Sequence, residues 1–191
     1  MKILFATSNI NKALEIQKLI PEGFEVLTLN NLDLQEEIPE TSDTIEGNAI
    51  QKTNYIVENF GINCFADDTG LEIEALNYEP GVYSARYAGE EKDSDKNMDL
   101  VLKKMEGITN RKARFKTIIS LSLNNKSYLF EGIVEGIIRK EKAGNLGFGY
   151  DPIFEPENKG KTFAEMTIEE KNNISHRGRA FEKMIHFLNS K

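Results

Sequence analysis

The first twenty residues of the chain predict a β-strand that leads directly into an α-helix. Residues 2–7 form a short apolar run, which changes at Thr7-Ser8-Asn9 to small polar side chains. Residues 12–20 then carry apolar side chains at helical spacing, and the segment ends at Pro21. A strand followed at once by a helix is typical of α/β proteins, so this beginning limits the fold class.

The junction between this strand and helix has the composition of an anion-binding site. A helix start presents unpaired backbone N–H groups and the positive end of the helix dipole. Lys12 adds a cation in the first turn, which is unfavourable unless an anion lies nearby. Ser, Thr and Asn are also the commonest helix caps, so an ordinary strand-to-helix turn is the alternative interpretation.

The rest of the chain alternates between helical and extended patterns. We predict strands at 24–29 and 62–66, helices at 44–60 and 93–105, a hairpin of residues 113–123 and 128–139, and a final helix near the C-terminus. Gly132 and Gly136, inside the second arm of the hairpin, suggest bulges or close backbone approach. The pattern predicts an α/β unit with two lobes and a cleft between them.

Composition excludes several classes of function. The chain has 31 acidic and 24 basic residues and a net charge of -7, which argues against binding to nucleic acid. The single cysteine, Cys64, excludes an internal disulfide, and with two histidines leaves too few ligands for structural zinc. A hard, oxygen-ligated metal is favoured instead. No signal-peptide pattern and no stretch of about 20 apolar residues is present, so we expect a cytoplasmic protein that does not bind membranes.

Acidic residues at two places could hold such a metal. Asp67 and Asp68 follow an apolar strand, where adjacent carboxylates are costly without a cation, and successive strand residues point to opposite sides. Glu36, Glu37 and Glu40 lie in the loop before the helix at 44–60, and one of them could complete a magnesium site with Asp68. The alternatives are a solvated Asp-Asp-Thr-Gly turn and a solvated acidic loop.

Two further segments have the composition of a ligand site. The basic residues Lys171, His176, Arg177 and Arg179 are concentrated near the start of the last helix, where cations are tolerable if an anion or a hydrogen-bonding ligand is bound. The segment 147–151 combines flexible backbone, two aromatic rings and an acid, and Phe148 could stack on a flat heterocycle. The alternatives are a solvated helix start and aromatic side chains that fill the core.

Taken together, these motifs resemble the inosine-triphosphate pyrophosphatase family, hydrolases of non-standard purine nucleotides. The resemblance covers nearly the whole chain and rests on the following segments: Ala6-Thr-Ser-Asn-Ile-Asn-Lys12, Glu40-Thr41, Glu46-Gly-Asn48-Ala49 with Lys52, Ala66-Asp-Asp-Thr-Gly-Leu71, Pro80-Gly-Val-Tyr-Ser-Ala-Arg86-Tyr87, Gly147-Phe-Gly-Tyr-Asp-Pro152-Ile-Phe, Lys161-Thr, Ala164-Glu165-Met, Glu170-Lys171 and Ile174-Ser-His-Arg-Gly178.

The resemblance implies a long mixed central sheet, two lobes with a cleft, and a homodimer, and we interpret residues 1–191 as a single domain. It implies magnesium-dependent hydrolysis of ITP, dITP and XTP to the monophosphate and pyrophosphate. Asp68 would be the proton acceptor and a metal ligand, and Glu40 the second metal ligand. The implied substrate-binding residues are Thr7, Ser8, Asn9, Ile10, Asn11 and Lys12 for the phosphates, Thr69, and Phe148, Gly149, Tyr150, Asp151, Lys171, His176 and Arg177, chiefly for the base.

The family usually has glycine at position 8 and serine at position 69. Ser8 places a side chain where backbone is expected to approach phosphate, whereas Thr69 keeps the hydroxyl. Donors such as His176 or Arg177 would bind the 6-keto group of hypoxanthine or xanthine and be left unpaired by adenine. Two alternatives stay open. One is a septum-inhibitor-like pyrophosphatase that acts on modified pyrimidine nucleotides, and the other is a non-catalytic sensor of nucleotides or RNA. The net charge of -7 argues against an RNA sensor.

Overall fold

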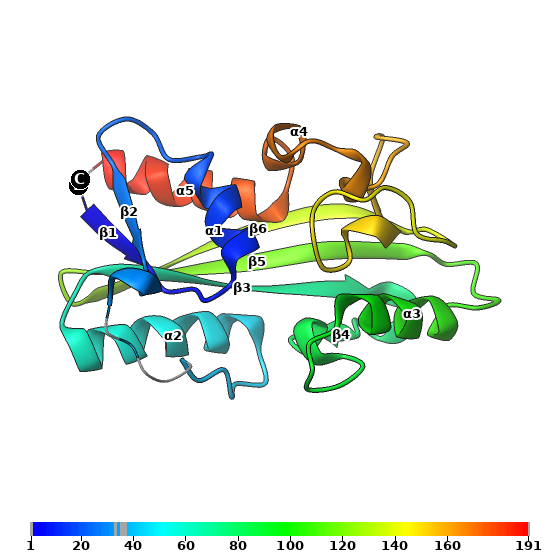
Figure 1. Cartoon of the computed structure of the whole chain (residues 1–191), viewed down its shortest axis with the longest axis horizontal. Coiled ribbons are helices and arrows are strands. Elements are labelled where there is room, and N and C mark those ends of the chain that lie inside the picture. Colours follow the sequence, from blue (N-terminus) through cyan, green and yellow to red (C-terminus); the bar gives the residue numbers. More distant parts are fainter. Residues whose placement is uncertain (1, 33, 35–37, 191) are drawn as a thin grey trace. The chain divides into compact units, whose positions relative to one another are not determined.

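The chain folds as an α/β protein around one mixed sheet, as expected (Figure 1). The computed structural model describes residues 2–32, 34 and 38–190. The helices are α1 (Ile10–Gln17), α2 (Ile45–Phe60), α3 (Ser94–Lys104), α4 (Ile168–Asn172) and α5 (His176–Asn189). The strands are β1 (Lys2–Phe5), β2 (Glu25–Thr28), β3 (Cys64–Ile73), β4 (Pro80–Gly81), β5 (Lys112–Leu123), β6 (Lys126–Ile138) and β7 (Phe154–Pro156).

The sheet combines parallel and antiparallel pairs. Its strand order is β2-β1-β3-β5-β6-β7, with β4 paired to β3. β1 lies parallel to β2 and to β3, whereas β4 is antiparallel to β3 and β7 is antiparallel to β6. The predicted long hairpin is confirmed as β5 and β6, and its turn places Asn124 and Asn125 at φ values of 51° and 60°. Asparagine tolerates this left-handed conformation better than most residues, which explains the turn.

The chain divides into two compact units, in agreement with the two predicted lobes. The first unit consists of Met1–Asp68, Thr117–Gly132 and Arg177–Lys191, and the second of Thr69–Lys116 and Ile133–His176. The strands β3, β5 and β6 each supply residues to both units. The single domain and the cleft between the lobes stay predictions.

In the first unit, the alternation of strand side chains separates two hydrophobic clusters. Ile3 and Phe5 of β1 and Phe65 of β3 pack with α1 and α5, and the Phe5 and Phe65 rings stack with centroids 4.5 Å apart. Leu4 of β1 and Cys64 of β3 belong to the other cluster, which includes Ile56 of α2. Odd-numbered residues at the start of β3 therefore face α1 and α5, and even-numbered residues face α2, on the two sides of the sheet seen in Figure 1.

The second unit has its own core. The buried residues Leu71 of β3, Val101 of α3 and Phe115 of β5 pack there with Phe154 and Phe163. The rings of Phe115 and Phe154 meet edge to face, with centroids 4.7 Å apart. The second unit therefore contains a hydrophobic core made of its own residues.

Gly136 is one of the two hairpin glycines for which close approach was predicted, and the structure confirms it there. It lies opposite Pro156 of β7, and an added Cβ would be 2.3 Å from the carbonyl oxygen of Glu155. We expect Gly136→Ala to force the two strands apart and to lower the free energy of unfolding by about 1–3 kcal/mol. Thermal unfolding of the purified variant measures this, and an unchanged Tm would contradict the predicted clash.

Candidate active site

The loop between β1 and α1 is organised around Asn9. The Asn9 side-chain oxygen accepts hydrogen bonds from the backbone N–H groups of Asn11 (3.0 Å) and Lys12 (3.2 Å), while Thr7 Oγ1 accepts from the Asn9 N–H (3.2 Å). Because Asn9 is the cap, α1 begins at Ile10 and not at the predicted Lys12. The predicted phosphate-binding residues 7–12 thus share one strand-to-helix junction, and the stretch 8–11 is exposed there.

The Asp-Asp-Thr-Gly segment is not a turn. The prediction ended a strand at Ala66, whereas β3 runs from Cys64 to Ile73 without interruption. Both aspartates therefore lie in mid-strand and are buried, with 1% of Asp67 and 8% of Asp68 exposed. Because side chains alternate along a strand, Asp67 faces α1 and α5, and Asp68 faces α2. The expectation that the two carboxylates have different surroundings is confirmed.

Asp67 accepts hydrogen bonds from two cations. Its Oδ1 accepts from Lys12 Nζ (3.1 Å), and its Oδ2 accepts from Arg177 Nε (3.0 Å). Burial alone would raise the pKa of Asp67, but the charges of Lys12 and Arg177 hold it well below its usual range. Arg177 also donates from Nη1 to the buried carboxylate of Glu15. An anion for Lys12 at the helix start is therefore supplied by the chain itself.

Asp68 lies against the first half of α2. Asn48 Nδ2 donates to Asp68 Oδ2 (3.3 Å), and Lys52 Nζ is 3.6 Å from Asp68 Oδ1. The same Lys52 ammonium donates to Glu40 Oε1 (2.6 Å). Burial raises the pKa of Asp68 above its ordinary value, an effect that Lys52 partly opposes. A buried carboxylate with a raised pKa is a stronger base than an exposed one, which suits proton abstraction.

Lys52 was quoted in the resemblance, but no role was predicted for it. It is buried, with 5% of its surface exposed, and lies four residues after the buried Asn48 in α2. Residues at this spacing share one helix face. In the sequence, the signal was a lysine and an asparagine at positions that the helical spacing assigns to the apolar face. This signal could have identified Asn48 and Lys52 as functional residues.

The two carboxylates predicted to bind metal both lie near one ammonium group. Glu40 and Asp68 both approach Lys52 Nζ, at 2.6 Å and 3.6 Å. Over residues 2–32, 34 and 38–190, no group of three or more His, Cys, Asp or Glu side chains could hold a metal by itself. Magnesium is usually bound by one or two carboxylates together with substrate phosphates. The two acids therefore fit a magnesium site that a phosphorylated ligand completes. Glu36 and Glu37, also considered for this role, lie outside the described residues.

A second group of predicted residues lies in the second unit around Asp151. Asp151 Oδ2 accepts hydrogen bonds from the Phe148 backbone N–H (2.8 Å) and from Lys171 Nζ (2.5 Å). Lys171 Nζ also lies 4.7 Å from the centroid of the Phe148 ring. The carboxylate thus fixes both the glycine-rich loop and the lysine. The structure brings Phe148, Asp151 and Lys171 together, as a shared role requires.

Other predicted substrate contacts have buried side chains. His176 is 3% exposed and stacks on Phe115, with centroids 4.6 Å apart. The Tyr150 hydroxyl donates to the backbone oxygen of Ser84 (2.8 Å), and the Tyr150 ring belongs to the core of the second unit. Arg177 is 1% exposed, and two of its nitrogens donate to Asp67 and Glu15. Contact of these side chains with a substrate stays a prediction, as it does for Gly149 and the half-buried Thr69.

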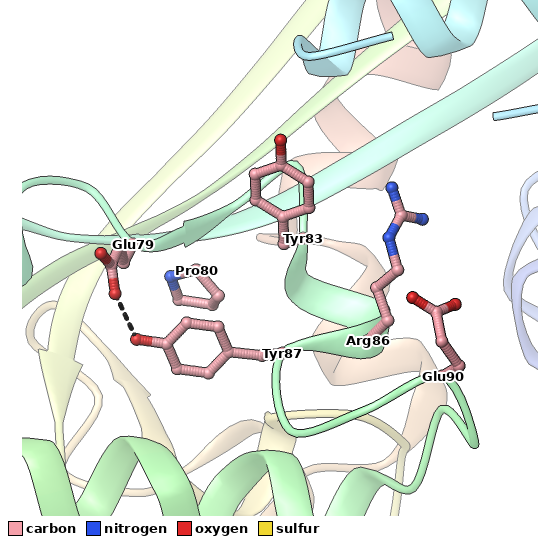
Figure 2. A pocket seen from close by; sticks show the side chains of 6 residues that line it. All are labelled: Glu79, Pro80, Tyr83, Arg86, Tyr87 and Glu90. Atoms are coloured by element: carbon pink, nitrogen blue, oxygen red, sulfur yellow. Dashed lines mark hydrogen bonds between the residues drawn. The ribbon is translucent and has the colours of Figure 1, made fainter. Parts of the chain in front are cut away.

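The Pro80–Tyr87 motif of the resemblance lines a pocket of about 430 Å³ in the second unit. Figure 2 shows its lining residues: Glu79, Pro80, Tyr83, Arg86, Tyr87 and Glu90. The Tyr87 hydroxyl donates to Glu79 (2.6 Å), and the Arg86 guanidinium lies 5.4 Å from the centroid of the Tyr83 ring.

Comparison with known proteins decides the family. The family model described as the Ham1 family matches residues 3–187. The chain belongs to the Ham1 family. It is 55% identical over 188 residues to a protein of Flavobacterium psychrophilum named dITP/XTP pyrophosphatase, with 98% of this chain and 99% of that protein covered. A protein of the same name from Bacillus subtilis is 43% identical over 189 residues, with 97% and 96% covered.

Solved Ham1 structures have the same fold. A HAM1 protein from Coxiella burnetii superposes with a TM-score of 0.92 at 36% identity, over 100% of both chains. The Staphylococcus aureus Ham1 protein gives a TM-score of 0.90 at 38% identity, over 100% of this chain and 99% of that one. The family resemblance read from the motifs and the predicted α/β fold are therefore confirmed. No helix within the described part of the chain is long and apolar enough to cross a membrane.

Proposed function

We propose that this Ham1 protein is a nucleoside-triphosphate pyrophosphatase that hydrolyses non-standard purine nucleotides such as dITP, XTP and ITP to the monophosphate and pyrophosphate. The observation that supports this most strongly is the full-length match, at 55% identity, to a protein named dITP/XTP pyrophosphatase. The buried carboxylates, the lysines beside them and the capped helix start support the proposal, because polyphosphate hydrolysis uses groups of these kinds.

In the proposed reaction, the residues of the first unit act on the polyphosphate. The 7–12 junction and Lys12 bind the phosphate oxygens and stabilise the negative charge of the departing pyrophosphate. Asp68 orients a water molecule and takes its proton as the water attacks the α-phosphorus, and the raised pKa of this buried carboxyl group favours the transfer. Lys52 keeps the side chains of Glu40 and Asp68 together.

Magnesium is the metal we propose for Glu40 and Asp68, whose oxygen atoms are ligands of the kind that this ion prefers. When bound, the ion would neutralise phosphate charge during the reaction. We also propose a homodimer, which the resemblance implies. From the sequence patterns and the net charge of -7, we propose a cytoplasmic location and no nucleic-acid partner.

The residues of the second unit are proposed to bind the purine. Phe148 offers an aromatic face, and Lys171 offers hydrogen-bond donors beside it. A donor such as Lys171 or His176 suits the 6-keto oxygen of hypoxanthine and xanthine. Adenine has an amino group at that position and would leave the donor unpaired, which is costly in a buried site.

Pyrophosphate release from a panel of nucleotides tests this function. With magnesium, we expect ITP, dITP and XTP to be hydrolysed with a kcat/KM at least about 100-fold above that for ATP, because a missing hydrogen bond discriminates strongly. Chromatography should identify the monophosphate and not the diphosphate as the product. Preference for dUTP or dTTP would favour a pyrimidine-specific pyrophosphatase, and ITP binding without pyrophosphate release would favour a sensor.

A further inference from the structure

Four ionised side chains in the first unit form a continuous chain of ion pairs. Lys12 donates to one oxygen of Asp67, Arg177 donates to the other oxygen, and Arg177 also donates to Glu15. The four residues carry two positive and two negative charges. Glu15 and Lys12 come from α1, Asp67 from β3 and Arg177 from α5, so three separate elements contribute. Asp67 contacts Lys12, whereas Glu15 contacts Arg177.

Solvent reaches this series of ion pairs at one end. The side chains of Asp67, Arg177 and Glu15 are 0%, 2% and 4% exposed, whereas that of Lys12 is 14% exposed. Within the described part of the chain, Asp67 is the one hydrogen-bond acceptor of the Lys12 ammonium. An ammonium group has three N–H donors, so two donors of Lys12 are left for a ligand. The accessible end of the network is therefore the residue proposed to bind phosphate.

Among the charges that act on Lys12, that of Asp67 has the largest influence. Burial lowers the pKa of Lys12 below its usual value, and the charge of Asp67 is the largest influence that opposes this. Lysine has a long, flexible stem, so its ammonium group needs a fixed partner to stay in one position. Arg177, which Glu15 also contacts, holds the Asp67 carboxylate from the other side.

We propose that Asp67 is a positioning residue: it holds the Lys12 ammonium in place for the polyphosphate and is itself held by the buried Arg177. The proposal rests on the proposed function, because it assigns Lys12 to phosphate. Asp67 touches no substrate and acts through Lys12. It thus differs from its neighbour Asp68, which faces α2 and is proposed to take the proton.

The alternative is that the network only stabilises the fold, and a pair of matched variants separates the two cases. Asp67→Asn and Glu15→Gln each remove one negative charge from the same network with almost no change in side-chain shape. Both are expected to lower Tm. Only Asp67→Asn should release Lys12. Loss of a residue that orients a metal ligand typically weakens metal binding about 10- to 100-fold, and we expect an effect of that size here.

The probe is inorganic tripolyphosphate with magnesium, whose binding is measured by titration calorimetry. We expect Asp67→Asn to raise its Kd about 10- to 100-fold and Glu15→Gln to raise it less than about threefold. With ITP, Asp67→Asn should chiefly raise KM. In a Lys12→Met background, Asp67→Asn should change the Kd less than about threefold, because residues that act through one another are not additive.

Equal effects of the two matched variants, or full additivity with Lys12→Met, would overturn the proposal. If Asp67→Asn does not fold, Asp67→Glu keeps the charge but moves it by one methylene group, and unchanged tripolyphosphate binding in that variant would equally overturn it. Failure of the proposed function has a different result: the wild-type protein would bind tripolyphosphate but release no pyrophosphate from ITP. A wild-type protein that does not bind tripolyphosphate would remove Lys12 from the phosphate site and the proposal with it.

Discussion

Replacing Asp68 with asparagine should abolish most of the pyrophosphatase activity and leave the fold intact. Asparagine has nearly the same shape as aspartate but cannot accept a proton, and loss of a general base typically lowers the rate about 10²- to 10⁴-fold. The amide can still accept a hydrogen bond from Asn48, and Glu40 stays as the partner of Lys52, so Asn at this buried position is not expected to unfold the chain. The measurement is kcat for ITP together with Tm of the same preparation.

Asp43→Asn is a suitable control for this experiment. Asp43 is exposed and precedes α2, so its substitution changes the net charge by the same amount outside the buried cluster. We expect its kcat to stay close to that of the wild-type protein, because isolated surface charges contribute little. Substantial turnover by Asp68→Asn would show that another group takes the proton.

The sequence predicted the local parts of this site well. The alternation of side chains along a strand depends only on neighbouring residues, so the different surroundings of Asp67 and Asp68 could be anticipated. The polar residues before α1 likewise indicated a helix start, although the prediction placed it two residues late, at Lys12. The paired Asn124 and Asn125 likewise identified the hairpin turn. These features need no knowledge of distant contacts.

The partners of the charged residues could not be predicted in this way. The Arg177–Asp67 and Arg177–Glu15 contacts join residues 110 and 162 positions apart. In the sequence, Glu15 resembles any solvent-facing glutamate of an amphipathic helix, and Arg177 resembles a ligand-binding cation at a helix start. Only the folded chain shows that each neutralises a charge on another element. The uninterrupted course of β3 through Asp-Asp-Thr-Gly was missed because turn-forming residues dominate the local pattern.

The largest expected effect on stability concerns the Lys171–Asp151 pair of the second unit. The two side chains are 4% and 3% exposed, and Lys171 Nζ donates to Asp151 Oδ2. Lys171→Met removes the cation but keeps most of the side-chain volume, so the buried Asp151 carboxylate loses the ammonium group that donates to its Oδ2. Such a loss typically costs about 3–5 kcal/mol. For a chain of this size, that corresponds to a fall in Tm of about 6–20 °C.

The chain offers a matched control nearby in sequence. Lys161 Nζ lies 2.9 Å from Glu170 Oε1, but these side chains are 38% and 50% exposed. Lys161→Met should lower the free energy of unfolding by less than about 1 kcal/mol, because water screens exposed pairs. The double variant Lys171→Met/Asp151→Asn also removes the carboxylate charge and keeps an acceptor for the Phe148 N–H, so part of the lost stability should return. Equal Tm values for Lys171→Met and Lys161→Met would show that the buried pair stabilises the protein no more than the exposed one.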